Sequence, residues 1–554
     1  MKKKSHKIRI DGPYKMGHVS WDYFFQLNED QSLYLIKDEP TDFTFKTTSE
    51  KEIDKLFLHT NGFDNQWEFI PVNKVDFNKF SSPLKFTTCG LFHFKLIYQF
   101  KNDENYYWDH QPYTKLSIES QSFHNISVYT YIPNISGKIS DWAKDFVKIS
   151  SLGFNAVHLL PITELDDSQS PYAAKELFHV DPYYFDLNKK NPEKHFIETL
   201  VEASQTNSIK LCLDLVFNHV GVNSNLVKKN PHWIHPDPFE KDGLKRAGYW
   251  HDNQWLKWRD IVLINFDHPV EEIKQEIWDY FIKYSLFWSE IANRTNGLIR
   301  LDNLHSTNFL FAEKALAEIR KNFPDLIIQA ELFADDYAIS KYMAKGNINL
   351  LLSTPWMAPY ARDFRNQIKN IHHLYEIKRY IFAVSSHDSD SAVEMYGSKE
   401  AIIPRYTATS LMSTGCTGMI QGTENGIPKK LKFIGYQPKL EIQEDLNLQK
   451  AITKINNLKN GYKTFQTGKN IEFIDNENSA ILACIRFGKK YNEPDFIIIT
   501  NFNTSGHQHL SLNLTNYHTH QAKNLFTGEI ISLINIKETT LAPSAAIILE
   551  ILPK

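Results

Sequence analysis

Residues 297–302 read GLIRLD, a short apolar run that carries Arg300 and ends in Asp302. Such a run is typical of a strand buried in a parallel sheet. Because side chains two positions apart point to the same face of a strand, Arg300 and Asp302 are expected to lie side by side at its end. Three other apolar runs carry an acid at their ends: IKLCLDLVF with Asp214, LIIQAEL with Glu331 and YIFAVSSHD with Asp388.

These four runs belong to a series of eight between residues 121 and 462, and the runs alternate with longer amphipathic segments. This alternation predicts βα units on a parallel sheet, and eight units predict an α/β fold of the (β/α)8 TIM barrel type. Active-site residues of such a barrel gather at the carboxyl ends of the strands, where the four acids are expected. The other four runs are NISVYTYI, NAVHLLPI, NLLLST and TGMIQGTE.

The segments on either side of the barrel change to a period of two. Runs such as LFHFKLIYQF before it and DFIIITNFN after it alternate between turn clusters, which predicts β-sandwiches. We therefore expect an N-terminal β-sandwich at 1–120, the catalytic barrel at 121–462 with a short excursion at 221–260 after the third strand, and a C-terminal β-sandwich at 463–554.

The composition is that of a large globular protein with little net charge. The 554 residues include 62 basic and 65 acidic side chains, so no basic field favours nucleic acid or an anionic membrane. The basic start MKKKSHK is not followed by the apolar stretch of a signal peptide. A cytoplasmic protein is therefore predicted, and export by a route without an N-terminal signal is the alternative. Four scattered cysteines predict buried, reduced thiols.

Two carboxyl groups are what cleavage of a glycosidic bond with retention requires. One is an ionised nucleophile, and the other is an acid about 5–5.5 Å away that protonates the leaving oxygen. Arg300 beside Asp302 favours the ionised form, which suits the nucleophile. Glu331 follows an alanine in an apolar strand with no adjacent base, which suits the acid/base. Asp388 is then expected to bind ring hydroxyls and to stabilise the transition state.

Each of these residues also has a simpler interpretation. A lone aspartate after an apolar run is commonly a turn former or a helix N-cap, and Arg300 alone could serve as a structural ion pair. His219 and His387 could be hydrogen-bonded scaffold residues. Caps do not explain why the third, fourth, fifth and seventh strands of one barrel all end in an acid.

The segments DLVFNH, GLIRLD, AELF and SSHD resemble, in this order, the four signature segments of the α-amylase superfamily, glycoside hydrolase family 13. The resemblance implies catalytic roles for Asp302, Glu331 and Asp388, and stacking of one tyrosine ring on the sugar at the point of cleavage. Around QAELFADD the chain is similar to the glucanotransferase half of eukaryotic-type glycogen debranching enzymes. The substrate-binding residues implied by the resemblance are Tyr172, Asp214, Asn218, His219, Arg300, His305 and His387.

The excursion after the third strand is rich in tryptophan. Its rings are expected either to fill the core of a small subdomain or to stack on glucose units. The calcium site usual in the superfamily is possible here, with Asn223 and Asp252 as oxygen ligands, but no spacing requires a metal, and no cofactor is predicted. The tryptophans are Trp233, Trp250, Trp255 and Trp258.

The leading hypothesis is a retaining α-glucan hydrolase of the α-amylase type, which cleaves α-1,4-glucosidic bonds of starch, glycogen or maltodextrins. Transfer by a 4-α-glucanotransferase or a debranching-type enzyme is the alternative on the same scaffold. A metal enzyme with the acids as ligands is disfavoured, because the Arg300 cation would compete with the metal. An inert glucan-binding protein is the third hypothesis, since a fold alone does not establish activity. The expected partner is thus an α-glucan, and no protein partner is identified.

Overall fold

The computed structural model describes residues 10, 12–25, 32–63, 66–120, 125–252, 254–374, 379–468, 470–476, 478–514, 517, 520–536 and 538–553. The basic N-terminal segment and residue 121, where the barrel was expected to begin, lie outside this part. The chain forms two compact units, one of residues 1–123 with 320–325 and one of residues 124–319 with 326–554. Within the described residues, no helix has the length and apolar character needed to cross a bilayer.

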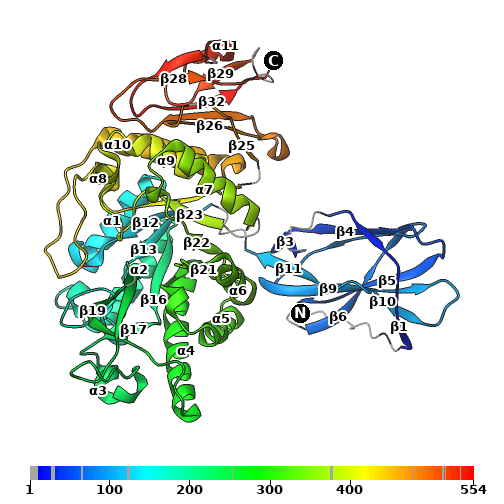
Figure 1. Cartoon of the computed structure of the whole chain (residues 1–554), viewed down its shortest axis with the longest axis horizontal. Helices are drawn as coiled ribbons and strands as arrows, with labels where there is room; N and C mark the ends of the chain where they lie inside the picture. The colour runs from blue at the N-terminus through cyan, green and yellow to red at the C-terminus, as the bar shows by residue number, and fades with distance from the viewer. Residues whose placement is uncertain are drawn as a thin grey trace. The chain divides into compact units, whose positions relative to one another are not determined.

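Eight parallel strands close into a barrel in the order of the chain (Figure 1). Each strand overlaps one of the eight apolar runs, so the predicted (β/α)8 fold is confirmed. The strands are β12 (Ser127–Tyr131), β13 (Ala156–Leu159), β16 (Lys210–Val216), β20 (Leu298–Asp302), β21 (Ile327–Ala330), β22 (Leu350–Leu352), β23 (Arg379–Ala383) and β24 (Cys416–Ile420).

The register between β16 and β20 positions the charged residues. Asp214 on β16 lies opposite Arg300 on β20, and Val216 lies opposite Asp302. Side chains two apart on a strand share a face, so this register brings the charges of two neighbouring strands to one end of the barrel.

Helices surround the barrel strands (Figure 1). The first shows why they form: its apolar residues Ile139, Trp142, Phe146 and Ile149 recur at helical spacing and are all buried. The helices are α1 (Ile139–Ser151), α2 (Pro192–Thr206), α4 (Glu271–Asn293), α5 (Phe309–Asn322), α6 (Asp336–Gly346), α7 (Ala361–Leu374), α8 (Ala392–Tyr396), α9 (Ile402–Leu411) and α10 (Leu446–Gly461).

Two excursions leave the barrel on the side where its strands end. The first, after β13, is a hairpin of β14 (Thr163–Leu165) and β15 (Ala174–Val180), and the loop between them carries Tyr172. The second follows β16 and forms a three-stranded sheet in the order β17-β19-β18. It consists of β17 (His219–Gly221), α3 (Asn225–Lys229), β18 (Arg246–His251) and β19 (Gln254–Leu263).

The N-terminal unit contains a seven-stranded and a four-stranded sheet. Phe43, Phe45, Phe80 and Phe94 from both sheets meet in one buried core, which accounts for part of the 37 phenylalanines. The strands are β1 (Tyr14–Met16), β2 (Trp21–Tyr23), β3 (Ser32–Ile36), β4 (Thr41–Thr47), β5 (Ile53–Phe63), β6 (Gln66–Val72), β7 (Lys74–Asp76), β8 (Lys79–Leu84), β9 (Gly90–Phe100), β10 (Tyr106–Trp108) and β11 (Thr114–Glu119).

The C-terminal sheets lie in the same compact unit as the barrel. A six-stranded and a two-stranded sheet share an aliphatic core that includes Ile497, Leu510 and Leu541, as a β-sandwich requires. The elements are β25 (Ile471–Phe473), β26 (Ile481–Arg486), β27 (Phe496–Asn501), β28 (Gln508–Ser511), β29 (Gln521–Asn524), β30 (Ile530–Ser532), α11 (Leu533–Ile536), β31 (Glu538–Leu541) and β32 (Ala546–Ile551). All four cysteines of the chain are buried thiols.

Candidate active site

Arg300 lies at the centre of the candidate site, with a side chain only 1% exposed. Its Nη1 donates to the two carboxylate oxygens of Asp214 at 2.9 and 2.6 Å and to Asp302 Oδ1 at 3.0 Å. Its Nη2 donates to Glu331 Oε2 at 2.8 Å. One buried guanidinium therefore holds three carboxylates, which come from β16, β20 and the end of β21.

This sharing corrects the expectation that Glu331 has no adjacent base, because Arg300 contacts Glu331 as well as Asp302. Arg300 and Glu331 are 31 positions apart in the chain, and the parallel pairing of β20 with β21 makes them neighbours. The backbone N–H of Asn303 also donates to Glu331 Oε2, at 3.0 Å. Arg300 thus does not distinguish the nucleophile from the acid in the way the sequence suggested.

The pKa values of the two aspartates move in opposite directions. Burial raises the pKa of Asp302 well above its usual range, the charges of Glu331 and Asp214 add to the rise, and Arg300 opposes it. Burial also acts to raise the pKa of Asp214, but Arg300 and a hydrogen bond from His158 outweigh it and lower this pKa to about 2. Asp214 is therefore the ionised partner of Arg300. Arg300 also favours the ionised form of Asp302, as expected, but burial and the neighbouring carboxylates oppose it.

His158 on β13 belongs to this cluster but was not among the residues predicted from the sequence. Its Nε2 lies 3.2 Å from Asp214 Oδ2, and its Nδ1 lies 3.4 Å from Thr130 Oγ1 on β12. The side chain is buried. The signal that could have marked it is a polar residue inside the otherwise apolar run NAVHLLPI.

Tyr172 and His387 form a stacked pair beside the carboxylates. Their ring centroids are 5.6 Å apart at an interplanar angle of 15°, and Tyr172 Oη lies 2.8 Å from His387 Nε2 and 3.2 Å from Asp214 Oδ2. Asp388 Oδ2 lies 3.3 Å from His387 Nε2, and the Asp388 side chain is 56% exposed. Burial, with Arg300 and His158, lowers the pKa of His387 to about 3, so its ring is neutral.

Three other predicted residues are His219, Asn218 and His305. His219 on β17 is buried, neither of its ring nitrogens has a hydrogen-bond partner in the described part of the chain, and burial lowers its pKa to about 4. The carbonyl of Asn218 accepts from the Ile264 N–H. His305, in the short η5 helix (Leu304–Ser306), accepts at Nδ1 from the Phe333 N–H at 3.3 Å.

The tryptophans of the excursion divide between its core and its surface. Trp233, at the end of η4 (Pro231–Trp233), is 7% exposed and packs edge-on to Tyr280, with centroids 5.5 Å apart. Trp258 on β19 is 37% exposed and lies 5.3 Å from the Tyr249 ring. Trp255 is partly buried, and the side chain of Trp250 lies outside the described part. The core interpretation therefore holds for Trp233, whereas Trp258 presents an accessible ring.

The two residues named for calcium, Asn223 and Asp252, lie in different parts of the excursion after β16. The Asn223 N–H donates to Asp166 at 2.7 Å and its side-chain amide donates to Asp167 at 3.1 Å, so Asn223 is engaged with protein carboxylates. Asp252 lies in the turn between β18 and β19. Across the described ranges, no group of three or more histidine, cysteine, aspartate or glutamate residues could hold a metal ion.

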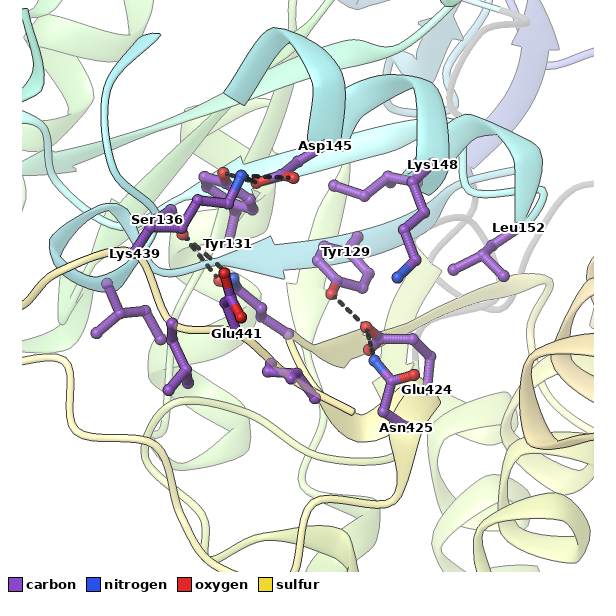
Figure 2. A pocket seen from close by; sticks show the side chains of 15 residues that line it. Tyr129, Tyr131, Ser136, Asp145, Lys148, Leu152, Glu424, Asn425, Lys439 and Glu441 are labelled. Atoms are coloured by element: carbon purple, nitrogen blue, oxygen red, sulfur yellow. Dashed lines mark hydrogen bonds and ion pairs between the residues drawn. The ribbon is translucent and has the colours of Figure 1, made fainter. Parts of the chain in front are cut away.

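A separate cavity of about 340 Å³ lies between β12, α1 and the segment that follows β24 (Figure 2). Its polar walls bond to each other: Tyr129 donates to Glu424 at 3.0 Å, and Tyr131 donates to Asp145 at 2.7 Å. These bonds connect the first strand of the barrel to α1 and to the region after the last strand.

Known proteins resemble parts of this chain in sequence. Residues 119–236 match the family model of the glucanotransferase domain of glycogen debranching enzyme. An α-1,4-glucan:maltose-1-phosphate maltosyltransferase of Picrophilus torridus is 20% identical over 399 residues, which are 68% of this chain and 60% of that protein. An intracellular maltogenic amylase of Bacillus subtilis is 22% identical over 396 residues, which are 66% and 61% of the two chains. The chain thus spans less than two thirds of the length of these relatives.

A solved structure supports the same fold. The maltogenic α-amylase of Thermotoga neapolitana superposes with a TM-score of 0.62 at 16% identity, covering 78% of this chain and 100% of that one. At this identity the likeness concerns the fold alone. In sequence the chain is thus similar to a maltosyltransferase and to a maltogenic amylase, and residues 119–236 match the glucanotransferase domain of glycogen debranching enzyme. In fold it is similar to a maltogenic α-amylase.

Proposed function

We propose that this chain is a retaining enzyme of the α-amylase type, which cleaves α-1,4-glucosidic bonds of starch, glycogen or maltodextrins by double displacement. The observation that carries the proposal is the single buried guanidinium of Arg300, bonded to both Asp302 and Glu331. A shared cation keeps the two carboxyl groups close together, as a retaining mechanism requires.

In the first step, the Asp302 carboxylate attacks the anomeric carbon. The bond from this carbon to the glycosidic oxygen breaks, and Glu331 gives its proton to that oxygen, so the leaving chain departs with a new hydroxyl. The remaining chain stays joined to Asp302 as an ester. The step begins with one proton on the carboxyl pair, carried by Glu331, while the Arg300 cation favours the ionised form of Asp302 against the effect of burial.

In the second step, Glu331 acts as a base. It takes a proton from water or from a sugar hydroxyl, whose oxygen attacks the anomeric carbon and releases the Asp302 carboxylate. Two inversions at this carbon give net retention. Attack by water gives hydrolysis, and attack by a sugar hydroxyl gives transfer.

Other residues of the site would hold the sugar. The Tyr172 ring offers an apolar face for a pyranose, and neutral His387 and exposed Asp388 offer a donor and an acceptor for ring hydroxyls. Buried, neutral His219 offers a ring nitrogen for a further sugar hydroxyl.

Product analysis tests the proposal. Wild-type protein is incubated with maltoheptaose and with glycogen, products are sized by chromatography, and the first-formed anomer is identified by NMR. We expect small sugars released as the α anomer, and no products from the Asp302→Asn variant. A β anomer would contradict double displacement, and unchanged substrate would favour the inert glucan-binding hypothesis.

Transfer by a 4-α-glucanotransferase is the second candidate. It is supported by the match of residues 119–236 to a glucanotransferase domain. Phe333, two residues after Glu331, is 45% exposed and offers an apolar surface on which an acceptor sugar could pack. In the same assay, transfer gives chains longer than maltoheptaose.

A further inference from the structure

Residues 427–440, which we call the strap, follow the η7 turn (Thr423–Asn425) and contain no helix or strand. The strap lies against the candidate site. The Lys430 side chain donates to the backbone carbonyl of Asp388 at 2.9 Å. Further along, the Phe433 ring lies edge-on to both members of the stacked pair, 6.4 Å from Tyr172 and 5.6 Å from His387.

Several bonds fix the strap to the loops around it. The Tyr436 ring stacks on Tyr183, with centroids 4.2 Å apart and an interplanar angle of 20°. Its hydroxyl donates to Asp181 at 2.6 Å. The backbone is held as well, by bonds from Asn134 to the Phe433 carbonyl at 2.8 Å and from the Gly435 N–H to the Gln169 carbonyl at 3.0 Å.

Phe433 is therefore a rigid part of the site rather than a mobile side chain. Together with Leu431 it packs against a buried apolar cluster formed by Ile132, Ile135, Leu160 and Ile420. To move the ring, the protein would have to open this packing and break the bonds of the strap.

The positions of the two catalytic carboxyls define the direction of a bound chain. Glu331 protonates the leaving oxygen, so the departing, reducing-end part of the chain lies on its side, near His305 and Phe333. The part that remains attached to Asp302 extends the other way, toward Tyr172 and His387. The Phe433 ring lies edge-on to both rings of this pair.

Building on the proposed function, we propose that Phe433 forms the end wall of this second side, so that the site accepts the non-reducing end of an α-glucan and not an interior stretch. A chain that continues past the wall, or carries a bulky group on its terminal glucose, would have to displace a ring held by packing and by the strap.

A pair of substrates tests the wall. Maltoheptaose is compared with maltoheptaose whose non-reducing end carries a 4,6-ethylidene group, and β-cyclodextrin is included as a substrate without ends. We expect wild-type kcat/KM to be about 10- to 100-fold lower for the blocked substrate, a loss typical of a pocket that rejects extra atoms. Phe433→Ala should recover most of the lost kcat/KM on the blocked substrate. Phe433→Leu, which removes less volume, serves if the alanine variant does not fold, and Phe487→Ala in the C-terminal sheets is the matched control.

The outcomes separate the two proposals. If wild type cleaves neither maltoheptaose nor the blocked form, the proposed function fails. If it cleaves the blocked substrate and the cyclodextrin as fast as maltoheptaose, the wall does not exist. If the folded Phe433 variants keep the full preference for free ends, the wall is formed by another residue and the inference is overturned.

Discussion

The carboxylates of Asp214, Asp302 and Glu331 share the Arg300 cation at the centre of this site, and this sharing affects Asp302 most. Asp214 takes two of the bonds from Arg300 and stays ionised, so Asp302 is left in a buried place that already contains negative charge. Catalytic groups are commonly held in such unfavourable surroundings, because the same surroundings supply their reactivity.

The Asp302→Asn variant tests, by stability as well as by activity, whether the Asp302 charge lies in unfavourable surroundings. We expect kcat to fall by about 10⁴-fold, since the nucleophile is lost. The pKa of Asp302 is raised in the folded protein, so wild type loses stability as the pH rises through that value, whereas the amide does not titrate. The variant should therefore melt at a higher temperature than wild type at pH 7, and the gain should disappear near pH 4.

Thermal melting at the two pH values measures this difference. Asp279→Asn, a change at an exposed position on α4, is the matched control and should leave the melting temperature unaltered at both. A variant that melts below wild type at pH 7 would mean that Arg300 stabilises the Asp302 charge more than burial destabilises it.

The acid/base role of Glu331 is tested with a substrate that does not need a proton on its leaving group. Glu331→Gln should lower kcat on maltoheptaose by about 10²- to 10⁴-fold but affect the first step with α-maltosyl fluoride far less. Added azide should intercept the ester and give a maltosyl azide. Asp302→Asn, tested in parallel, should be rescued by neither reagent. Equal losses on both substrates would remove Glu331 from the role of acid.

At the scale of elements, the eight strands could be predicted because each is an apolar run bounded by polar segments. The site could be predicted in part for the same reason, because Arg300 and Asp302 are two apart on one strand and Asp214 and Glu331 lie at the ends of others. The bond from Arg300 to Glu331 could not be predicted, since it depends on the register in which β20 pairs with β21. Nor could Phe433, because the strap has no periodicity that marks its place.

The three-stranded excursion after β16 contains a matched pair for testing the two roles of its tryptophans. Trp233→Ala should destabilise the protein by about 3–5 kcal/mol, because it empties a buried site against Tyr280. Trp258→Ala should change stability by no more than about 0.5 kcal/mol, because its ring is at the surface. If the excursion binds glucan, only Trp258→Ala will raise KM while the variant remains fully folded.

At the scale of the whole molecule, the chain forms two compact units, each with its own hydrophobic core. We therefore expect two transitions in scanning calorimetry. Maltoheptaose at 100 times its Kd, added to the inactive Asp302→Asn variant, should stabilise the unit that holds the barrel by about 2.7 kcal/mol and leave the other transition in place. A single transition whose temperature rises when maltoheptaose is added would show that the two units unfold together.

The pairing of Asp214 with Arg300 across β16 and β20 also bears on how the barrel finds its correct alignment. If either strand slipped by one residue, its side chains would exchange inside for outside, and the guanidinium would be buried away from its carboxylates. An unpaired buried charge costs several kcal/mol, so mispaired barrels would be penalised as they form. The charged residues of the proposed active site would then also disfavour barrels in which β16 and β20 pair out of register.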